Sequence, residues 1–315
     1  MKKTIYTVAL AALMMAGCSQ DESLNVGEEV QVTFTANLSN GIHSRADGAA
    51  GVSVDKLICA VCKQNGETLV QELIRDTVPV TNGTATFTPT LLKGYKYGIV
   101  FWAYKEGQEY YDTSNLSQIT FNPNANDNQN PNDEHLIVYT NTIKNVSTSS
   151  SDRVVTLTRP LAQVNVATTK SDWETVEALG ETPATSTVIL ENCCNMYNAL
   201  TGTYSGEADF TYTIDLAYDT LLEETDNILL GTGYTFPGNN VECIISVKNN
   251  ASSPVEIYNK EIDNFPTTAN YRTNFVPKTT DDEGNPVKGG LMTGSVSYEV
   301  NIQAGYSGNE ANPVE

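Results

Sequence analysis

The chain has 315 residues, with 18 Lys and Arg against 38 Asp and Glu, and a formal net charge of −20. So acidic a chain repels phosphate backbones, which argues against nucleic acid as a partner. His43 and His135 are its only histidines. We therefore expect no cofactor, no His-rich metal site and little scope for histidine-based catalysis.

The N-terminus has the pattern of an export signal. Lys2 and Lys3 precede an apolar stretch over residues 4–16, which is shorter than the roughly 20 residues that a membrane-spanning helix needs. It reads as a signal peptide. The sequence Met-Ala-Gly before Cys18 resembles a bacterial lipobox, in which the cysteine thiol receives the lipid, including palmitate. The alternative is an ordinary signal peptide that happens to contain a cysteine.

We therefore predict that residues 1–17 are a lipoprotein signal peptide and that Cys18 is lipidated. Acyl chains would then attach the protein to the membrane. Residues 19–22 read Ser-Gln-Asp-Glu and look like the acidic export signal of Bacteroidetes surface lipoproteins. This predicts exposure on the surface of the outer membrane. Loss of the leader removes Lys2 and Lys3, which leaves 16 basic against 38 acidic residues and a net charge of −22.

The first predicted strand of the mature chain covers residues 30–38. Apolar and polar residues alternate strictly there, which is typical of a half-buried strand. The apolar face holds Val30, Val32, Phe34, Ala36 and Leu38. A small, polar, glycine-bearing loop follows over residues 39–51, and we expect it to be exposed. It contains Arg45, the only Lys or Arg between Cys18 and Lys56.

Further strands are predicted over residues 54–62 and 96–104. Asn65-Gly66 and Asn82-Gly83 are hairpin turn signals. Cys59 and Cys62 have the spacing of a redox or zinc pair, but in a strand they point to opposite faces. We therefore favour two buried thiols.

The segment 122–134 is polar and carries three carboxylates, Asp127, Asp133 and Glu134. Oxygen ligands of this kind suit calcium, but the spacing lacks the EF-hand pattern. A solvated loop is the favoured interpretation.

About 300 mature residues favour two domains. Pro160 interrupts the β-rich stretch 153–168, and we place the boundary there. Short strands recur in the second half over residues 186–190, 210–216, 227–230, 241–247 and 255–262, with helices predicted at 171–179 and 217–224. This spacing predicts an all-β fold of two β-sandwiches with about seven strands each and few short helices.

The last predicted strand covers residues 296–304 and alternates as the first strand does. Its apolar face holds Val296, Tyr298, Val300, Ile302 and Ala304. Cleavage after Arg45 would sever the first strand and open an apolar groove with unpaired sheet edges, which recruit other strands. The terminal strand of a neighbouring subunit could then insert. The alternative is that both are plain strands and that Arg45 is an incidental loop residue.

Several segments resemble the fimbrillin superfamily of Bacteroidia, the subunits of type V pili. Ser44-Arg45-Ala46 looks like the site where an arginine-specific protease matures such pilins. Two other segments carry the most specific likeness, residues 158–166 (Thr-Arg-Pro-Leu-Ala-Gln-Val-Asn-Val), followed by Asp172-Trp173, and residues 270–274 (Asn-Tyr-Arg-Thr-Asn).

This resemblance implies two transthyretin-like β-sandwiches, cleavage between Arg45 and Ala46, and assembly by donor-strand exchange. The first strand, Val30 to Leu38, would be displaced, and the last strand, Val296 to Ala304, would be the donor. The expected segments are a lipidated propeptide over 18–45, an N-terminal sandwich over 46–158 and a C-terminal sandwich over 159–315. The implied partners are other pilin subunits, of its own or an accessory kind, and the protease.

An enzyme is not expected, because the chain lacks a Gly-x-Ser-x-Gly motif, a His-Glu-x-x-His motif and a phosphate loop. Arg159 and Arg272 could bind anions, although a structural role is favoured. The alternative function is a monomeric surface lipoprotein that binds a glycan or host ligand. A stacking platform for sugars could then come from Tyr95, Tyr97, Trp102, Tyr104, Tyr110 and Tyr111.

Overall fold

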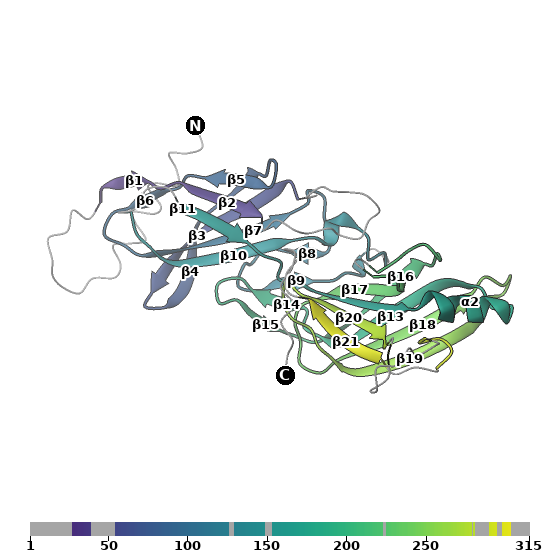
Figure 1. Cartoon of the computed structure of the whole chain (residues 1–315). Coiled ribbons are helices and arrows are strands. Elements are labelled where there is room, and N and C mark those ends of the chain that lie inside the picture. Colours follow the sequence, from purple (N-terminus) through teal and green to yellow (C-terminus); the bar gives the residue numbers. More distant parts are fainter. Residues whose placement is uncertain are drawn as a thin grey trace.

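The structure is a computed structural model that describes residues 27–38, 54–125, 129–148, 153–222, 225–278, 280, 290–294 and 298–303. The predicted all-β class is confirmed (Figure 1). Within these residues there is one α-helix, α2 (Lys170–Ala178), and one 3-10 turn, η2 (Glu134–Leu136). No helix in the described ranges is long and apolar enough to cross a membrane.

The first half of the chain forms three sheets. The largest has the order β10-β7-β3-β4, with β10 (Tyr139–Val146), β7 (Tyr97–Tyr104), β3 (Lys56–Asn65) and β4 (Thr68–Pro79). Facing it is β11-β2-β5, with β11 (Arg153–Leu157), β2 (Phe34–Leu38) and β5 (Thr84–Phe87). A short pair joins β1 (Glu29–Gln31) to β6 (Thr90–Leu92).

Both predicted hairpin turns are present. Gly66 lies between β3 and β4 with a φ of 58°, and Asn82 and Gly83 have φ values of 51° and 73°. Two successive positive φ angles are the requirement of a type I′ turn, which Asn-Gly meets at low cost.

The second half forms two four-stranded sheets. One has the order β17-β12-β20-β21, with β17 (Ile228–Thr235), β12 (Ala162–Thr168), β20 (Arg272–Pro277) and β21 (Tyr298–Gln303). The other has the order β16-β13-β18-β19, with β16 (Ala208–Asp215), β13 (Pro183–Cys193), β18 (Val241–Asn249) and β19 (Glu256–Phe265). Pro160 lies between β11 and β12, so it interrupts the β-rich stretch as expected.

A fourth four-stranded sheet joins the two halves. Its order is β15-β14-β9-β8, with β15 (Thr203–Ser205), β14 (Met196–Asn198), β9 (Ile119–Phe121) and β8 (Tyr111–Asp112). Figure 1 shows these strands at the junction between the two sets of sheets, which lie end to end. The aromatic side chains of Phe121 and Phe236 meet there with ring centroids 5.4 Å apart. One hydrophobic core therefore contains residues of both halves.

The sheet β10-β7-β3-β4 is buried on both faces. Cys59 packs into the core of the first sandwich, whereas Cys62 packs into the core shared across the junction. The prediction of two buried thiols on opposite faces is confirmed. A strand covered on both sides needs a nearly continuous apolar run, which explains why β3 reads Leu-Ile-Cys-Ala-Val-Cys.

Three predicted elements are changed by the structure. The strand expected over residues 30–38 is split at residues 32–33, and its two parts pair with different strands, β1 with β6 and β2 with β5 and β11. The helix predicted at 171–179 is α2, which Thr169 caps by accepting a hydrogen bond from the Asp172 N–H. The helix predicted at 217–224 is wrong, since the described part of this segment forms turns and a bridge between Leu221 and Ile228.

Candidate functional site: the β2 groove and the terminal strand

β2, the strand expected to be displaced, is the central strand of its sheet. It pairs parallel with β11, where Ala36 lies opposite Val155, and antiparallel with β5, where Thr35 lies opposite Thr86. Removing a central strand leaves a gap with an unpaired edge on each side, so an incoming strand could be hydrogen-bonded on both.

The apolar face of β2 is deeply buried. Val32, Phe34, Ala36 and Leu38 are between 0% and 6% exposed. The ring of Phe34 lies 6.0 Å from that of Phe101 and 6.3 Å from that of Phe87, measured between centroids. Val30 lies on β1 and is only half-buried. The predicted apolar face therefore fills the first core from Val32 onward.

The other face of β2 is polar and hydrogen-bonded to the neighbouring strand. The Thr84 hydroxyl donates to the Asn37 side-chain oxygen over 3.1 Å. The Thr88 hydroxyl donates to the Thr33 hydroxyl over 3.4 Å. These contacts fix the register of the strand, as the apolar stripe does on its opposite face.

The terminal strand β21 lies at the edge of its sheet and pairs antiparallel with β20. Its predicted apolar residues are exposed, with Tyr298 at 36%, Val300 at 41% and Ile302 at 38%. Tyr298 contacts the ring of Phe275 at 4.4 Å and the ammonium group of Lys260 at 5.3 Å. β21 is thus held by its ladder with β20 and by few apolar contacts.

The turn just before β21 is fixed by a buried carboxylate. Asp172 in the first turn of α2 is fully buried and accepts hydrogen bonds from the Met292 N–H at 2.8 Å and the Thr293 N–H at 2.9 Å. The hydroxyls of Thr168 and Thr293 also donate to it. A Cβ at Gly290 would lie 2.3 Å from the Asp172 Cβ, so the chain approaches α2 as closely as only glycine allows.

The two segments with the most specific family likeness lie side by side. β12 and β20 pair in parallel, which brings Gln163 opposite Arg272 and Asn165 opposite Asn274. The Asn165 side-chain amide donates to the Asn274 side-chain oxygen over 2.7 Å, and both residues are buried. Sequence reasoning identified both segments but not their contact.

Five predicted site residues lie outside the described part of the chain. They are Cys18, Arg45, Ala46, Val296 and Ala304. Lipidation and cleavage therefore stay predictions, as does the role of each strand in exchange.

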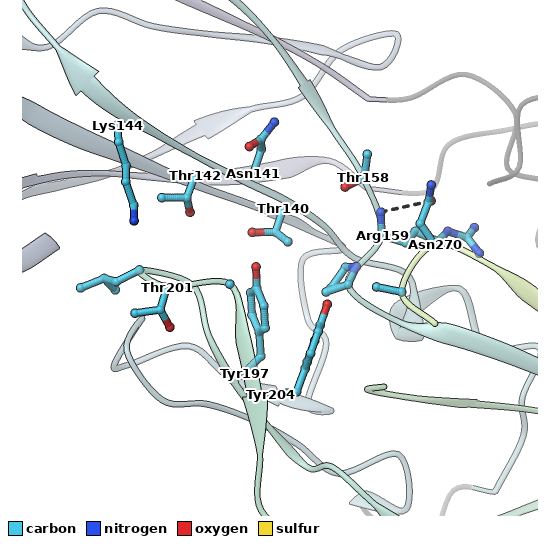
Figure 2. A pocket seen from close by; sticks show the side chains of 14 residues that line it. Thr140, Asn141, Thr142, Lys144, Thr158, Arg159, Tyr197, Thr201, Tyr204 and Asn270 are labelled. Carbon is cyan, nitrogen blue, oxygen red and sulfur yellow. Dashed lines mark hydrogen bonds between the residues drawn. The ribbon is translucent and has the colours of Figure 1, made fainter. Parts of the chain in front are cut away.

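A cleft of about 320 Å³ lies where β10 faces the β14–β15 hairpin (Figure 2). Tyr197 and Tyr204 lie on one side of it, opposite Thr140 and Thr142 of β10. Its hydroxyl groups are already engaged within the chain, because Thr140 donates to the Phe101 carbonyl and Thr142 donates to the Ala199 carbonyl. The cleft is therefore a packed junction more than a prepared ligand site.

The tyrosine platform suggested for sugar binding is not formed. Tyr97 and Trp102 are fully buried, and Tyr110 and Tyr111 are 6% and 5% exposed. Their rings fill the two cores and are closed to a ligand; burial also raises the pKa of Tyr97 to about 12. The interpretation as core aromatics is confirmed for these four residues.

The two candidate anion-binding arginines differ in setting. Arg159 is 2% exposed at the rim of the cleft, with its guanidinium carbon 5.7 Å from the centre of the Tyr139 ring. This is a cation–π contact, and it fits the structural role favoured from the sequence. Arg272 begins β20 and is half-buried.

Carboxylates come together at two places. Asp133 accepts hydrogen bonds from the Tyr110 hydroxyl at 2.6 Å and the His135 N–H at 2.9 Å. Partial burial raises its pKa, but these hydrogen bonds outweigh that effect and lower the pKa overall. On β18 and β19, carboxylate oxygens of Glu242, Glu261 and Asp263 lie within 4.8 Å of one another, and two of these residues are exposed. The sequence gave no signal for this second cluster, because strand pairing creates it.

Three solved structures show a similar arrangement. A candidate cell adhesion protein from Bacteroides eggerthii matches with a TM-score of 0.50 at 12% identity, covering 88% of this chain and 96% of its own. One from Bacteroides ovatus gives 0.49 at 13% identity, covering 87% and 97%. The tip fimbrial protein Mfa3 from Porphyromonas gingivalis, truncated at its C-terminus, gives 0.44 at 13% identity, covering 87% and 99%. At these identities the likeness concerns the fold alone.

No curated protein matches the sequence. The pattern of one protein family matches residues 23–314, which is nearly the whole predicted mature chain and includes both β2 and β21. The chain therefore belongs to DUF6562, a family of unknown function.

Proposed function

We propose that this protein is a fimbrial subunit of the type V kind, structural or accessory, that assembles by donor-strand exchange. In this proposal β2 leaves after cleavage between Arg45 and Ala46, and the last strand of another subunit takes its place. The role is structural, not catalytic, in keeping with the lack of catalytic motifs in the sequence. The shared fold with the cell adhesion candidate of Bacteroides eggerthii agrees with it.

The observation that carries the proposal is the contrast between two similar strands. β2 is central in its sheet and buried on its apolar face, whereas β21 is an edge strand whose apolar side chains are exposed. Exposed apolar side chains on a strand indicate a surface that another molecule covers. A head-to-tail contact of this type does not close on itself, so it builds a filament.

Lipidation at Cys18 would deliver the precursor to the outer membrane and hold it at the cell surface. Cleavage at Arg45 would then release the body of the subunit from the lipid together with its first strand. The partners are accordingly the arginine-specific protease, the membrane and other pilin subunits.

The test uses the full-length lipoprotein extracted in mild detergent and treated with an arginine-specific protease. We expect a cut after Arg45, followed by SDS-resistant ladders on gels and filaments in electron micrographs. Arg45→Gln is the matched control, because it leaves every described contact unchanged and removes only the site of the cut.

Two outcomes would count against the proposal. A clean cut at Arg45 that yields only monomers would overturn polymerisation of this subunit with itself. Ladders that form equally well with Arg45→Gln would show that loss of the first strand is not what starts assembly.

A further inference from the structure

The sequence of β2 and the two residues before it matches the sequence around β21 in one register. Residues 32–38 read Val-Thr-Phe-Thr-Ala-Asn-Leu, and residues 296–302 read Val-Ser-Tyr-Glu-Val-Asn-Ile. An aromatic residue meets an aromatic one, asparagine meets asparagine, and every apolar position meets an apolar residue. This register differs by two residues from one that would place Val296 at Val30.

We propose that residues 296–302 of a second copy of this chain replace residues 32–38 in this register. Tyr298 then occupies the position of Phe34, and Asn301 occupies that of Asn37. The inference rests on the proposed function and adds to it the identity of the donor and the position of each donor residue.

The position of Phe34 is the most demanding in the groove. It is fully buried between the rings of Phe87 and Phe101, with centroid distances of 6.3 Å and 6.0 Å. Only an aromatic side chain fills such a space without a large cavity. Tyr298 is the only aromatic residue in residues 295–304, so this one position selects the register.

Shifts by two residues fit poorly. One shift puts Val300 at the position of Phe34 and Ala304 at that of Leu38, which leaves two cavities. Burying a smaller side chain at such positions costs about 2–5 kcal/mol each. The opposite shift puts Tyr298 at the position of Ala36, opposite Ala85 and Val155, where the ring would overpack the core.

Shifts by one residue are excluded by the alternation itself. Such a shift turns every side chain to the opposite face of the sheet. Glu299 and Asn301 would then point into a core where Phe34 and Ala36 are 0% and 3% exposed. A buried carboxylate without a partner is strongly unfavourable.

The polar face supports the same register. Asn37 accepts a hydrogen bond from the Thr84 hydroxyl over 3.1 Å, and Asn301 carries the same side chain at the matched position. Glu299 takes the place of Thr35 opposite Thr86, which is exposed, so its carboxylate stays in water.

Two positions in this register are not identical in size or polarity. Val300 is larger than Ala36, which lies opposite the small Ala85. The Tyr298 hydroxyl enters a space that Phe34 fills completely, so Tyr298→Phe should keep or strengthen exchange, whereas Tyr298→Ala should abolish it.

β21 can leave its own chain at low cost. Its release exposes little additional apolar surface, because Tyr298, Val300 and Ile302 are already more than a third exposed. The backbone hydrogen bonds to β20 are exchanged for bonds to water and then for bonds to the new partner. Insertion buries the three apolar side chains, and that burial supplies the net driving force.

Disulfide cross-linking between two cleaved variants tests the register. Thr86→Cys is mixed with Glu299→Cys, since these residues lie directly opposite each other in the proposed complex. Opposed residues in an antiparallel pair have Cβ atoms roughly 4.5–5.5 Å apart, close to disulfide geometry, whereas diagonal ones lie roughly 7–8 Å apart. The matched controls are Thr86→Cys mixed with Ser297→Cys or with Asn301→Cys.

We expect cross-linked chains on non-reducing gels for the Glu299→Cys mixture and their loss for both controls. The native thiols should not compete in the folded protein, because burial raises the pKa of Cys62, Cys193 and Cys243 to about 12. Unsubstituted protein carried through the same oxidation accounts for the half-buried Cys194.

The outcomes separate this inference from the proposed function. Polymers that cross-link only through Ser297→Cys or Asn301→Cys, or through none of the three, overturn the register while assembly by this subunit stands. Cleaved protein that forms no polymer in any mixture overturns the proposed function, and the register falls with it.

Discussion

Asp172 shows how one buried side chain positions the strand that is proposed to leave. Its carboxylate accepts hydrogen bonds from Met292 and Thr293 and so fixes the turn before β21 to the start of α2. The sequence marked Asp172-Trp173 as part of a family segment. It could not show the contact with Met292, because no periodic pattern links residues that far apart.

Replacing Asp172 by alanine should destabilise the protein. The backbone N–H groups of Met292 and Thr293 would lose their acceptor, and a buried donor left without a partner costs about 1–3 kcal/mol. Urea unfolding measures the change in the free energy of unfolding. Glu177→Ala on the exposed face of the same helix is the control and should change it by about 0.5 kcal/mol or less. Equal effects of the two substitutions would contradict this account of the turn.

At the scale of the element, β2 and β21 have similar sequences and very different surroundings. The alternation predicted that each strand has one apolar face, and both strands are present. It could not predict which face another sheet covers, because a period of two fixes only the side on which residues lie. The break at Thr33 has the same cause, since β1 and β2 each follow a different pairing partner.

Matched substitutions in the two strands should therefore have unequal effects on the uncleaved protein. Phe34→Ala removes a fully buried ring and should lower the free energy of unfolding by about 3–5 kcal/mol. Ile302→Ala acts on a side chain that is 38% exposed and should lower it by about 0.5 kcal/mol or less. Denaturant titration of both variants measures the difference. A large loss from Ile302→Ala would mean that β21 is an integral part of its own domain.

At the scale of the whole molecule, the two halves share a hydrophobic core. Turn signals and Pro160 allowed the all-β class and most strands to be predicted from the sequence. The joining sheet was not predicted, since β8, β9, β14 and β15 have three residues or fewer each and no clear alternation. Their positions depend on tertiary contacts, such as those of Phe236 with Phe121 and Tyr197.

Phe236→Ala should accordingly destabilise both halves together. Phe236 is fully buried at the junction, so the loss should be about 3–5 kcal/mol. Trp102 lies in the first half and Trp173 in the second, and single-tryptophan variants report on each half by fluorescence. Both midpoints should fall together, with Val255→Ala, which is 56% exposed, as the control. A fall in only one midpoint would show that the halves unfold independently.

The central claim is that β2 leaves and β21 of another copy takes its place. Hydrogen–deuterium exchange followed by mass spectrometry, on the uncleaved protein and on the cleaved assembly, tests it most directly. The account predicts that the peptide covering β21 exchanges fast before cleavage and becomes protected in the assembly, from which the peptide covering β2 is lost. A β2 peptide that remains bound and protected after cleavage, or a β21 peptide that exchanges equally fast in both states, would contradict it.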